Sequence, residues 1–296
     1  MKYVFAFALA LLSTPLAAQE VTIDTYAGLT TLPASPQKIA VFDLAALDTL
    51  AALGVTPDGV ISPTYLPHLD RAAEGAEPVG SLFEPDFEAV NALQPDLIIA
   101  GGRSQEHVPT LSNLAPTIDM TIWEDTIGQG LERLTAYGTL FGKEAEAAAL
   151  RATFEDKLDR TRTATADQGK TLVIMTNGPK VTAYGASGRF GWLYSGLGLQ
   201  EAVADVETTT HGEAISFEFI REANPDVLLV VDRLGAIGAD GDRAQVTLDN
   251  ALVHDTAAWK SGKVIYLNAG AVYIAGGGIQ SMTLVLDDVL AALSIE

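Results

Sequence analysis

The chain alternates between short, continuous apolar runs and longer segments in which apolar residues recur with helical spacing. Residues 97–100 and 227–231 are continuous apolar runs of the kind that form buried parallel strands. Residues 44–53 and 279–293 have an apolar period near 3.6, which predicts helices. Because strands and helices alternate, we predict an α/β fold with right-handed crossovers. Further strands are expected at 21–26, 38–42, 55–61, 117–122, 171–176, 181–184 and 264–267, and short helices at 87–93, 191–197 and 217–223.

A short segment occurs twice, at residues 87–99 and 217–229. Phenylalanine, glutamate, proline and aspartate recur in it at identical spacing, with apolar residues matched between them. In each copy, Pro-Asp ends a short helix and the chain enters a buried strand. Such joints are common, so one likeness could arise by chance. An arginine follows the strand in both copies, Arg103 in the first and Arg233 in the second, which favours two lobes of related structure.

A long polar helix is predicted between these lobes. From residue 130 to about 166 the sequence is rich in Ala, Leu, Glu, Lys and Arg and has no proline, a composition with high helix propensity. We predict a shorter helix that ends near Gly142 and a linking helix over 142–167, whose mixed charges suit a solvated spacer. The first lobe then covers residues 19–141 and the second lobe 168–296. The predicted architecture is two Rossmann-like α/β lobes bridged by one long helix.

Composition narrows the classes of function. The chain has 296 residues and 48% apolar content, which is enough for two well-buried lobes. Its formal net charge is −20, so its overall field opposes binding to nucleic acid or to an anionic membrane surface. Most of this charge is explained by solubility alone. The chain has no cysteine, which excludes disulfides, thiolate metal sites and a lipoprotein anchor.

The first 18 residues have the pattern of an export signal. Lys2 precedes an apolar run over residues 3–12, and small residues end the segment at Ala18. The run is well short of the roughly 20 residues that a membrane-spanning helix needs. We therefore expect cleavage near Ala18, no membrane anchor, and a mature, monomeric protein in the periplasm.

Three arginines are candidates for a binding site. Arg103 and Arg233 follow predicted strands, and Arg189 follows a third strand-like stretch. Ligands of parallel α/β sheets bind beyond the carboxyl ends of the strands, so the three side chains could face one cleft. Guanidinium groups bind planar anionic oxygens through paired hydrogen bonds. Any one of them could instead form a surface salt bridge, but their shared placement in a very acidic chain favours a site for an anionic ligand.

Two further residues could bind a metal ion. His211 lies in a polar loop, and Tyr273 lies in a loop with several glycines before the last helix. A phenolate is a hard oxygen donor that suits Fe(III), but spacing alone does not separate this role from a solvated histidine and a packed tyrosine. The glycines at 276–278 could cradle an anion at a helix N-terminus, although a hinge is the better interpretation. No catalytic constellation is recognisable, so we do not expect an enzyme.

The chain resembles the periplasmic iron-siderophore-binding proteins of ABC importers, most closely the binders of catecholate (enterochelin-type) siderophores. The likeness covers essentially the whole mature chain. Segment 268–272, before Tyr273, departs from this pattern because it is one residue shorter and has fewer aromatic residues, which leaves ligand selectivity open. The stretches that carry the resemblance are 101–103, 187–191, 210–216, 224–233, 248–253, 264–267 and 273–277.

The resemblance implies a function for each candidate residue. The bound ligand would be a ferric siderophore, tetradentate rather than hexadentate, and the protein would have no intrinsic cofactor. Arg103, Arg189 and Arg233 would contact the anionic catecholate oxygens. His211 and Tyr273 would complete the coordination of the iron where the siderophore leaves two positions open.

The resemblance also gives the repeated glutamates a function. In related importers one glutamate per lobe docks onto arginines of the two permease subunits, and Glu88 and Glu218 match those positions. The expected partners are a ferric siderophore and an inner-membrane ABC permease dimer.

Three alternatives to this function remain. The first is a binder of haem, cobalamin or another metal chelate on the same fold. The second is a binder of a free metal ion, which three arginines would repel. The third is a siderophore-processing hydrolase, for which no nucleophile–base pair is apparent.

Overall fold

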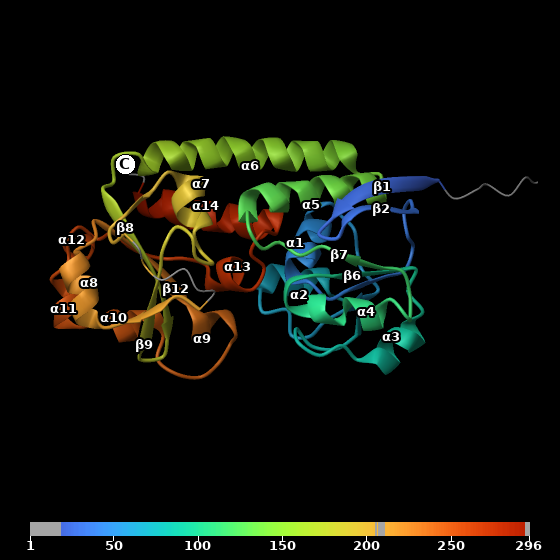
Figure 1. Ribbon diagram of the computed structural model, residues 1–296, viewed down its shortest axis with the longest axis horizontal. Coiled ribbons are helices and arrows are strands. Elements are labelled where there is room, and N and C mark those ends of the chain that lie inside the picture. Colours follow the sequence, from blue (N-terminus) through green and yellow to red (C-terminus); the bar gives the residue numbers. More distant parts are fainter. Residues whose placement is uncertain (1–18, 205, 207–210, 294–296) are drawn as a thin grey trace, which may run out of the picture.

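Two α/β sheets, a parallel one in the N-terminal lobe and a mixed one in the C-terminal lobe, form the framework of the molecule (Figure 1). The computed structural model describes residues 19–204, 206 and 211–293. The export signal predicted at residues 1–18 and the loop residues just before His211 lie outside this range. Among the residues described, no helix is both long and apolar enough to cross a membrane. The predicted α/β fold class is confirmed.

The N-terminal lobe contains a parallel sheet with the strand order β5-β4-β3-β6-β7. A separate antiparallel hairpin of β1 and β2 packs against α5. The strands are β1 (Glu20–Thr25), β2 (Gly28–Pro33), β3 (Ile39–Val41), β4 (Gly59–Val60), β5 (Glu77–Pro78), β6 (Leu97–Ala100) and β7 (Thr117–Asp119). The helices are α1 (Leu44–Ala52), α2 (Pro67–Ala72), α3 (Phe87–Leu93), the 3-10 helix η1 (Gly102–His107), α4 (Val108–Leu111) and α5 (Thr126–Phe141).

The C-terminal lobe has the strand order β11-β9-β8-β12-β13, with β10 paired to β8. Only Gly178 and Pro179 join β8 to β9, so these two strands pair antiparallel. The strands are β8 (Lys170–Asn177), β9 (Lys180–Tyr184), β10 (Gln200–Glu201), β11 (Glu213–Ile215), β12 (Val227–Asp232) and β13 (Val264–Tyr266). Helix α6 (Glu144–Thr165) links the two lobes. The helices of the C-terminal lobe are α7 (Trp192–Leu197), α8 (Phe217–Ala223), α9 (Arg233–Ala236), α10 (Ala244–Leu248), α11 (Ala251–His254), α12 (Ala257–Lys260), α13 (Ala269–Tyr273) and α14 (Ile279–Leu293).

The repeated segment has the same structure in both lobes. Its helix is α3 in the first copy and α8 in the second, and its strand is β6 or β12. The Asp96 carboxylate accepts a hydrogen bond from Lys38 N at 2.9 Å, and the Asp226 carboxylate accepts one from Lys170 N at 2.8 Å. Lys38 directly precedes β3 and Lys170 begins β8, the strands that pair with β6 and β12. The repeat therefore extends to the bonds that join each segment to its sheet.

Helix α6 lies along one side of the molecule and passes over both lobes (Figure 1). It covers Glu144–Thr165 and follows α5, whose C-cap is the left-handed Gly142. The interpretation of this helix as a solvated spacer is only partly right. Ala147, Phe154 and Leu158 are buried because α6 packs against α5 and α14. The linking helix is thus also part of the hydrophobic core.

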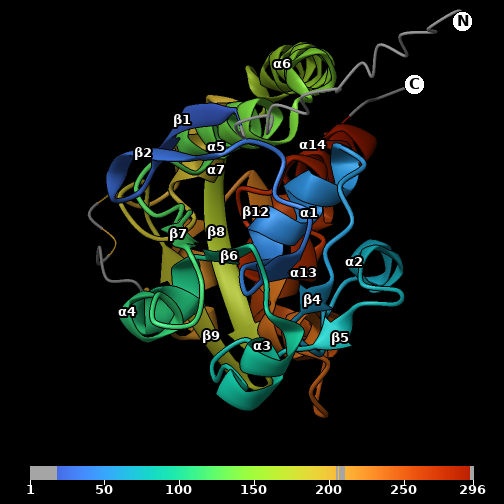
Figure 2. The same ribbon diagram turned by 90° about the vertical axis from the view of Figure 1, so that its right-hand side faces the viewer.

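The C-terminal helix α14 is the last element of the second lobe in sequence, but it packs on α1 of the first lobe (Figure 2). Its N-terminus is capped by Asp48, a fully buried side chain of α1 that accepts hydrogen bonds from Gln280 N at 2.7 Å and Ser281 N at 3.0 Å. A Cβ on Gly278 would lie 2.6 Å from the Asp48 side chain. Because a carboxylate already occupies this helix end, it is not an anion cradle, and Gly278 serves close packing between the lobes.

Two predicted strands are shorter than expected. Strand β4 covers only Gly59–Val60 of the segment 55–61, and it starts after Pro57 because proline has no N–H for a sheet ladder. Strand β7 ends at Asp119, whose carboxylate accepts hydrogen bonds from Thr121 N at 3.0 Å and Thr121 Oγ1 at 2.6 Å. A side chain that bonds to the backbone two residues later favours a turn over a continued strand.

Candidate functional site

Arg103 lies directly after the buried strand β6, at the start of η1. Two glycines make this connection possible. A Cβ on Gly101 would lie 2.9 Å from Thr121 N, and Gly102 has a φ of +53°. The Gly102 N–H donates a hydrogen bond to Thr121 Oγ1 at 2.9 Å. The tight turn places the Arg103 side chain at the carboxyl edge of the first sheet.

Arg233 lies at the corresponding edge of the second sheet. Strands β8 and β12 pair in parallel with Thr176 opposite Asp232, so the next residues, Asn177 and Arg233, are neighbours. Arg233 Nη1 donates a hydrogen bond to Asn177 Oδ1 at 3.3 Å. Arg189 follows β9 after a tight turn in which the Gly188 N–H donates to the Gly185 carbonyl at 3.0 Å. Arg103 and Arg233 thus lie just beyond the carboxyl ends of parallel strands. Arg189 follows β9, which runs antiparallel to β8, so the rule for strand ends does not account for its position.

Tyr273 is the last residue of helix α13, and the prediction that it lies in a flexible loop was wrong. The Asn268 side chain caps this short helix by accepting a hydrogen bond from Ala271 N at 3.1 Å. Glycine and alanine obscured the helix in the sequence because they give no periodic apolar pattern. The helix fixes the position of the Tyr273 carbonyl and ring.

All three arginines converge on Tyr273. Arg103 Nη2 and Arg189 Nη2, from different lobes, donate hydrogen bonds to the Tyr273 carbonyl at 2.9 and 2.8 Å. Arg233 Nε donates to the Tyr273 hydroxyl at 3.2 Å. The Arg189 guanidinium carbon lies 4.2 Å from the centre of the tyrosine ring, a cation–π contact. Carbonyls at a helix C-terminus lack partners and attract cations. Each guanidinium has five N–H donors, so donors remain for a ligand.

The arginines change the acidity of the tyrosine. Burial pushes the pKa of the Tyr273 phenol upward, but the hydrogen bond from Arg233 and the charges of the three arginines outweigh it, so the pKa falls below its ordinary value of 10. Burial and the charge of Arg103 lower the pKa of Arg189. An anion bound here would relieve this repulsion between guanidinium groups.

We expect Tyr273 to ionise before the buried tyrosines as the pH rises. Burial raises the pKa of four others, Tyr137, Tyr184, Tyr194 and Tyr266, so they titrate above the ordinary value, whereas Tyr273 titrates below it. An ultraviolet titration of phenolate absorption should therefore lose an early step of one proton in Tyr273→Phe. A matched Tyr266→Phe protein should keep that step and lose a later one. An unchanged early step in Tyr273→Phe would contradict the electrostatic account.

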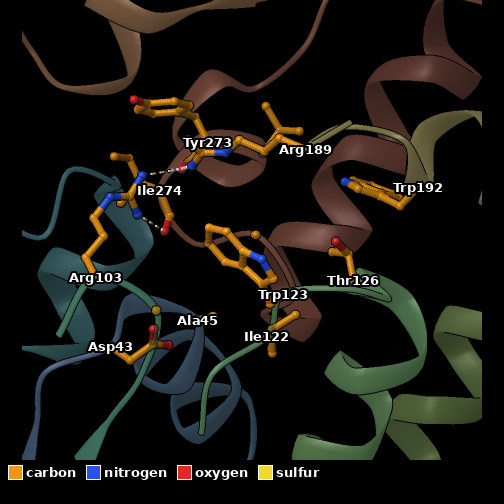
Figure 3. A pocket seen from close by; sticks show the side chains of 13 residues that line it. Asp43, Ala45, Arg103, Ile122, Trp123, Thr126, Arg189, Trp192, Tyr273 and Ile274 are labelled. Carbon is orange, nitrogen blue, oxygen red and sulfur yellow. Dashed lines mark hydrogen bonds between the residues drawn. The ribbon is translucent and has the colours of Figure 1, made fainter. Parts of the chain in front are cut away.

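A cavity of about 310 Å³ opens beside these side chains (Figure 3). Arg103 of the first lobe and Arg189 and Tyr273 of the second lobe line it. Arg233 does not belong to the lining and joins the site through the Tyr273 hydroxyl. The cavity therefore has residues of both lobes in its wall, and its basic groups lie where the lobes meet.

The sequence analysis missed several residues that line this cavity, among them Asp43, Trp123 and Trp192. Trp123 has an exposed fraction of 61%, whereas Trp192 is 8% exposed. Asp43 follows β3 closely and Trp123 follows β7, so the rule that ligands bind beyond strand ends could have found both. Trp192 begins α7, and no sequence signal distinguished it from a core residue.

His211 lies away from the cavity lining. It is exposed and lies two residues before the start of β11, and its carbonyl accepts a hydrogen bond from the Tyr184 hydroxyl at 3.0 Å. Burial raises the pKa of Tyr184 to about 12, so this phenol remains a donor at neutral pH. Tyr184 packs edge-on against Phe190, next to Arg189. The structure thus places the His211 backbone beside Tyr184, and iron ligation by its imidazole stays a prediction. Within the described part of the chain, no group of three or more His, Cys, Asp or Glu side chains could hold a metal ion.

Glu88 and Glu218 are exposed and lie in the first turns of α3 and α8. Hydrogen bonds from its own backbone N–H and from Ser216 lower the pKa of Glu218, so it is charged at neutral pH. The two helices lie in different lobes, toward opposite ends of the long axis (Figure 1). Both acids are accessible to a partner at equivalent positions of the repeat.

Two α/β lobes that share a cavity lined by arginine and tyrosine define a two-lobed ligand-binding protein. The family model of the periplasmic binding proteins matches residues 39–271, and the chain belongs to this family. The petrobactin-binding protein YclQ of Bacillus subtilis is 36% identical over 88% of this chain and 83% of its own length. The ferric-anguibactin-binding protein FatB of Vibrio anguillarum is 30% identical over 91% and 86%. The crystal structure of the periplasmic catecholate-siderophore-binding protein VctP of Vibrio cholerae superposes with a TM-score of 0.84 at 32% identity, over 92% of this chain and all of that one.

Proposed function

We propose that this protein captures a ferric siderophore of the catecholate class, with a tetradentate ligand, and delivers it to an ABC importer. The observation that carries the proposal is the convergence of Arg103, Arg189 and Arg233 on Tyr273 beside a cavity lined by both lobes. The names of the relatives support it, since YclQ, FatB and VctP are all named for siderophores that they bind.

The chemistry of the site suits an anionic iron chelate. The guanidinium groups donate hydrogen bonds to catecholate oxygens and offset their charge. Tyr273, with its lowered pKa, supplies a phenolate oxygen to an open position on the iron, and metal binding favours the deprotonated form. His211 supplies the last ligand to the iron. No resident cofactor is needed, and the bound ligand leaves chemically unchanged.

The same proposal covers export and transport. Residues 1–18 direct the chain to the periplasm and are cleaved near Ala18, and the mature protein acts as a monomer. Glu88 and Glu218 dock on an inner-membrane permease dimer, one acid per lobe. The exposure of both acids at equivalent positions of the repeat supports this arrangement.

A titration of tryptophan fluorescence against four ferric chelates and haem tests the ligand class. Trp123 and Trp192 line the cavity, so a bound ferric chelate should quench them. We expect tight, saturable quenching by a bis-catecholate, weaker quenching by a tris-catecholate, and little by a hydroxamate, citrate or haem. Tight binding of haem alone would show that the protein carries a different iron chelate. Recovery of intact bis-catecholate after prolonged incubation separates binding from hydrolysis.

Removal of two arginines should weaken binding strongly. Each charge-assisted hydrogen bond is worth on the order of tenfold in affinity, so Arg189→Ala/Arg233→Ala should lose roughly a hundredfold for the ferric bis-catecholate. The wild-type affinity should fall with added salt more steeply than that of the variant. Arg160→Ala/Arg221→Ala removes the same charge from exposed positions and should bind normally. Wild-type affinity in the first variant would contradict an anion site.

A further inference from the structure

A carboxylate faces the same cavity as the arginines. Asp43 lies just after β3, at the carboxyl edge of the first sheet, and is one of the residues that line the cavity (Figure 3). One of its oxygens, Oδ1, accepts a hydrogen bond from Ala46 N at 2.7 Å, so Asp43 is the N-cap of α1. Asn, Ser or Thr would cap the helix equally well without a charge. The cap alone therefore does not explain a carboxylate in a cavity for an anionic ligand.

Burial raises the pKa of the Asp43 carboxyl group, while the hydrogen bond from Ala46 N and the charge of Arg103 oppose this rise. Arg103 lies on the same wall, but its Nη1 and Nη2 donate to the carbonyls of Ile274 and Tyr273 instead. Within residues 19–204, 206 and 211–293, no salt bridge includes Asp43. Gly102, with its φ of +53°, has no side chain to cover Asp43, and a Cβ there would lie 3.1 Å from Asp43 Oδ2. This part of the cavity lining thus holds a carboxyl group beside Arg103 that no salt bridge among the described residues includes.

The carboxylate form of Asp43 would repel the anionic oxygens of a ligand, and like charges in an interface cost affinity. A ligand that carries a hydrogen-bond donor beside its anionic chelate would instead gain a charge-assisted bond. We propose that Asp43 is a specificity-determining residue that binds an ammonium or amide N–H group of the siderophore, and so selects chelates with one anionic and one donor-bearing end. This inference rests on the proposed function and names the ligand class more narrowly.

Two ferric bis-catecholates that differ only in the linker test this inference. One linker contains a secondary ammonium group and the other a methylene group at the same place. The wild type should prefer the ammonium chelate by about tenfold or more, the worth of one charge-assisted hydrogen bond. Asp43→Asn keeps a capping side chain and should lose most of that preference, chiefly through weaker binding of the ammonium chelate. Asp86→Asn is the control. The Asp86 carboxylate caps α3 by accepting a hydrogen bond from Ala89 N and does not line the cavity, so this variant should keep the preference.

The outcomes separate this inference from the proposed function. Wild-type binding of both chelates with the same preference in Asp43→Asn would overturn the inference alone. An equal loss of affinity for both chelates in Asp43→Asn would show that Asp43 only caps the helix, and would also overturn the inference. The wild type could instead prefer the methylene chelate, and this preference could grow as the pH falls. That result would mean that a protonated Asp43 donates a hydrogen bond to the ligand, and it would also overturn the inference. Failure of the wild type to bind either chelate would overturn the proposed function itself.

Discussion

Reversal of both docking charges, in Glu88→Arg/Glu218→Arg, is expected to abolish uptake of the ferric bis-catecholate while its affinity for the protein stays unchanged. Both carboxylates are exposed and lie in the first turns of equivalent helices, outside the cavity lining. A reversed charge turns attraction to a basic permease surface into repulsion, which affects the rate of encounter as well as the stability of the complex. Uptake of radioactive iron into cells and fluorescence titration of the purified protein measure the two quantities separately.

The control must change the net charge by the same amount near the same helices. Glu84→Arg/Glu222→Arg does so at two other exposed acids, one just before α3 and one within α8. This variant should transport iron at close to the wild-type rate. If both double variants lost uptake equally, general charge rather than specific docking would be responsible. A loss of ligand affinity in Glu88→Arg/Glu218→Arg would show that these acids shape the cavity.

Elements that depend on local chemistry could be predicted from the sequence residue by residue. The predicted bounds 87–93, 97–100, 217–223 and 279–293 are those of α3, β6, α8 and α14. In the two copies of the repeat, Asp86 or Ser216 caps the start of the helix, and a residue in the left-handed conformation ends it. The start and end signals of each helix lie within a few residues of each other. The placement of Arg103 and Arg233 at strand ends follows from the same local pattern.

The contacts between the lobes could not be predicted in this way. That Arg103 and Arg189 share one carbonyl depends on how α13 is placed between two sheets, and nothing near Tyr273 in the sequence encodes it. The burial of Asp48 against the start of α14 joins residues more than two hundred positions apart. Asp43 was missed because a helix-capping aspartate looks ordinary until the cavity beside it is seen.

Replacement of Tyr273 by phenylalanine is expected to remove the visible charge-transfer band that a phenolate–iron bond would add to the bound ferric bis-catecholate. The affinity should fall by at least about tenfold, the scale of effects seen when a metal site loses a supporting group. The ring, and with it the cation–π contact to Arg189, is retained, so the change is confined to the hydroxyl that accepts from Arg233. Absorption spectra of the complex and a fluorescence titration check the two effects. Tyr266→Phe, at a tyrosine outside the cavity lining, is the control.

The pH dependence of binding distinguishes iron ligation from a merely structural phenol. If Tyr273 ligates iron, it must lose its proton, so binding releases one proton at any pH below the phenol pKa. The affinity of the wild type should then rise with pH about tenfold per unit more steeply than that of Tyr273→Phe, over the range in which the free chelate stays intact. A phenol that only receives a hydrogen bond from Arg233 keeps its proton, and both proteins would then show the same slope. Equal slopes, or a charge-transfer band that persists in Tyr273→Phe, would remove Tyr273 from the coordination of the iron and leave the arginines as the basis of recognition.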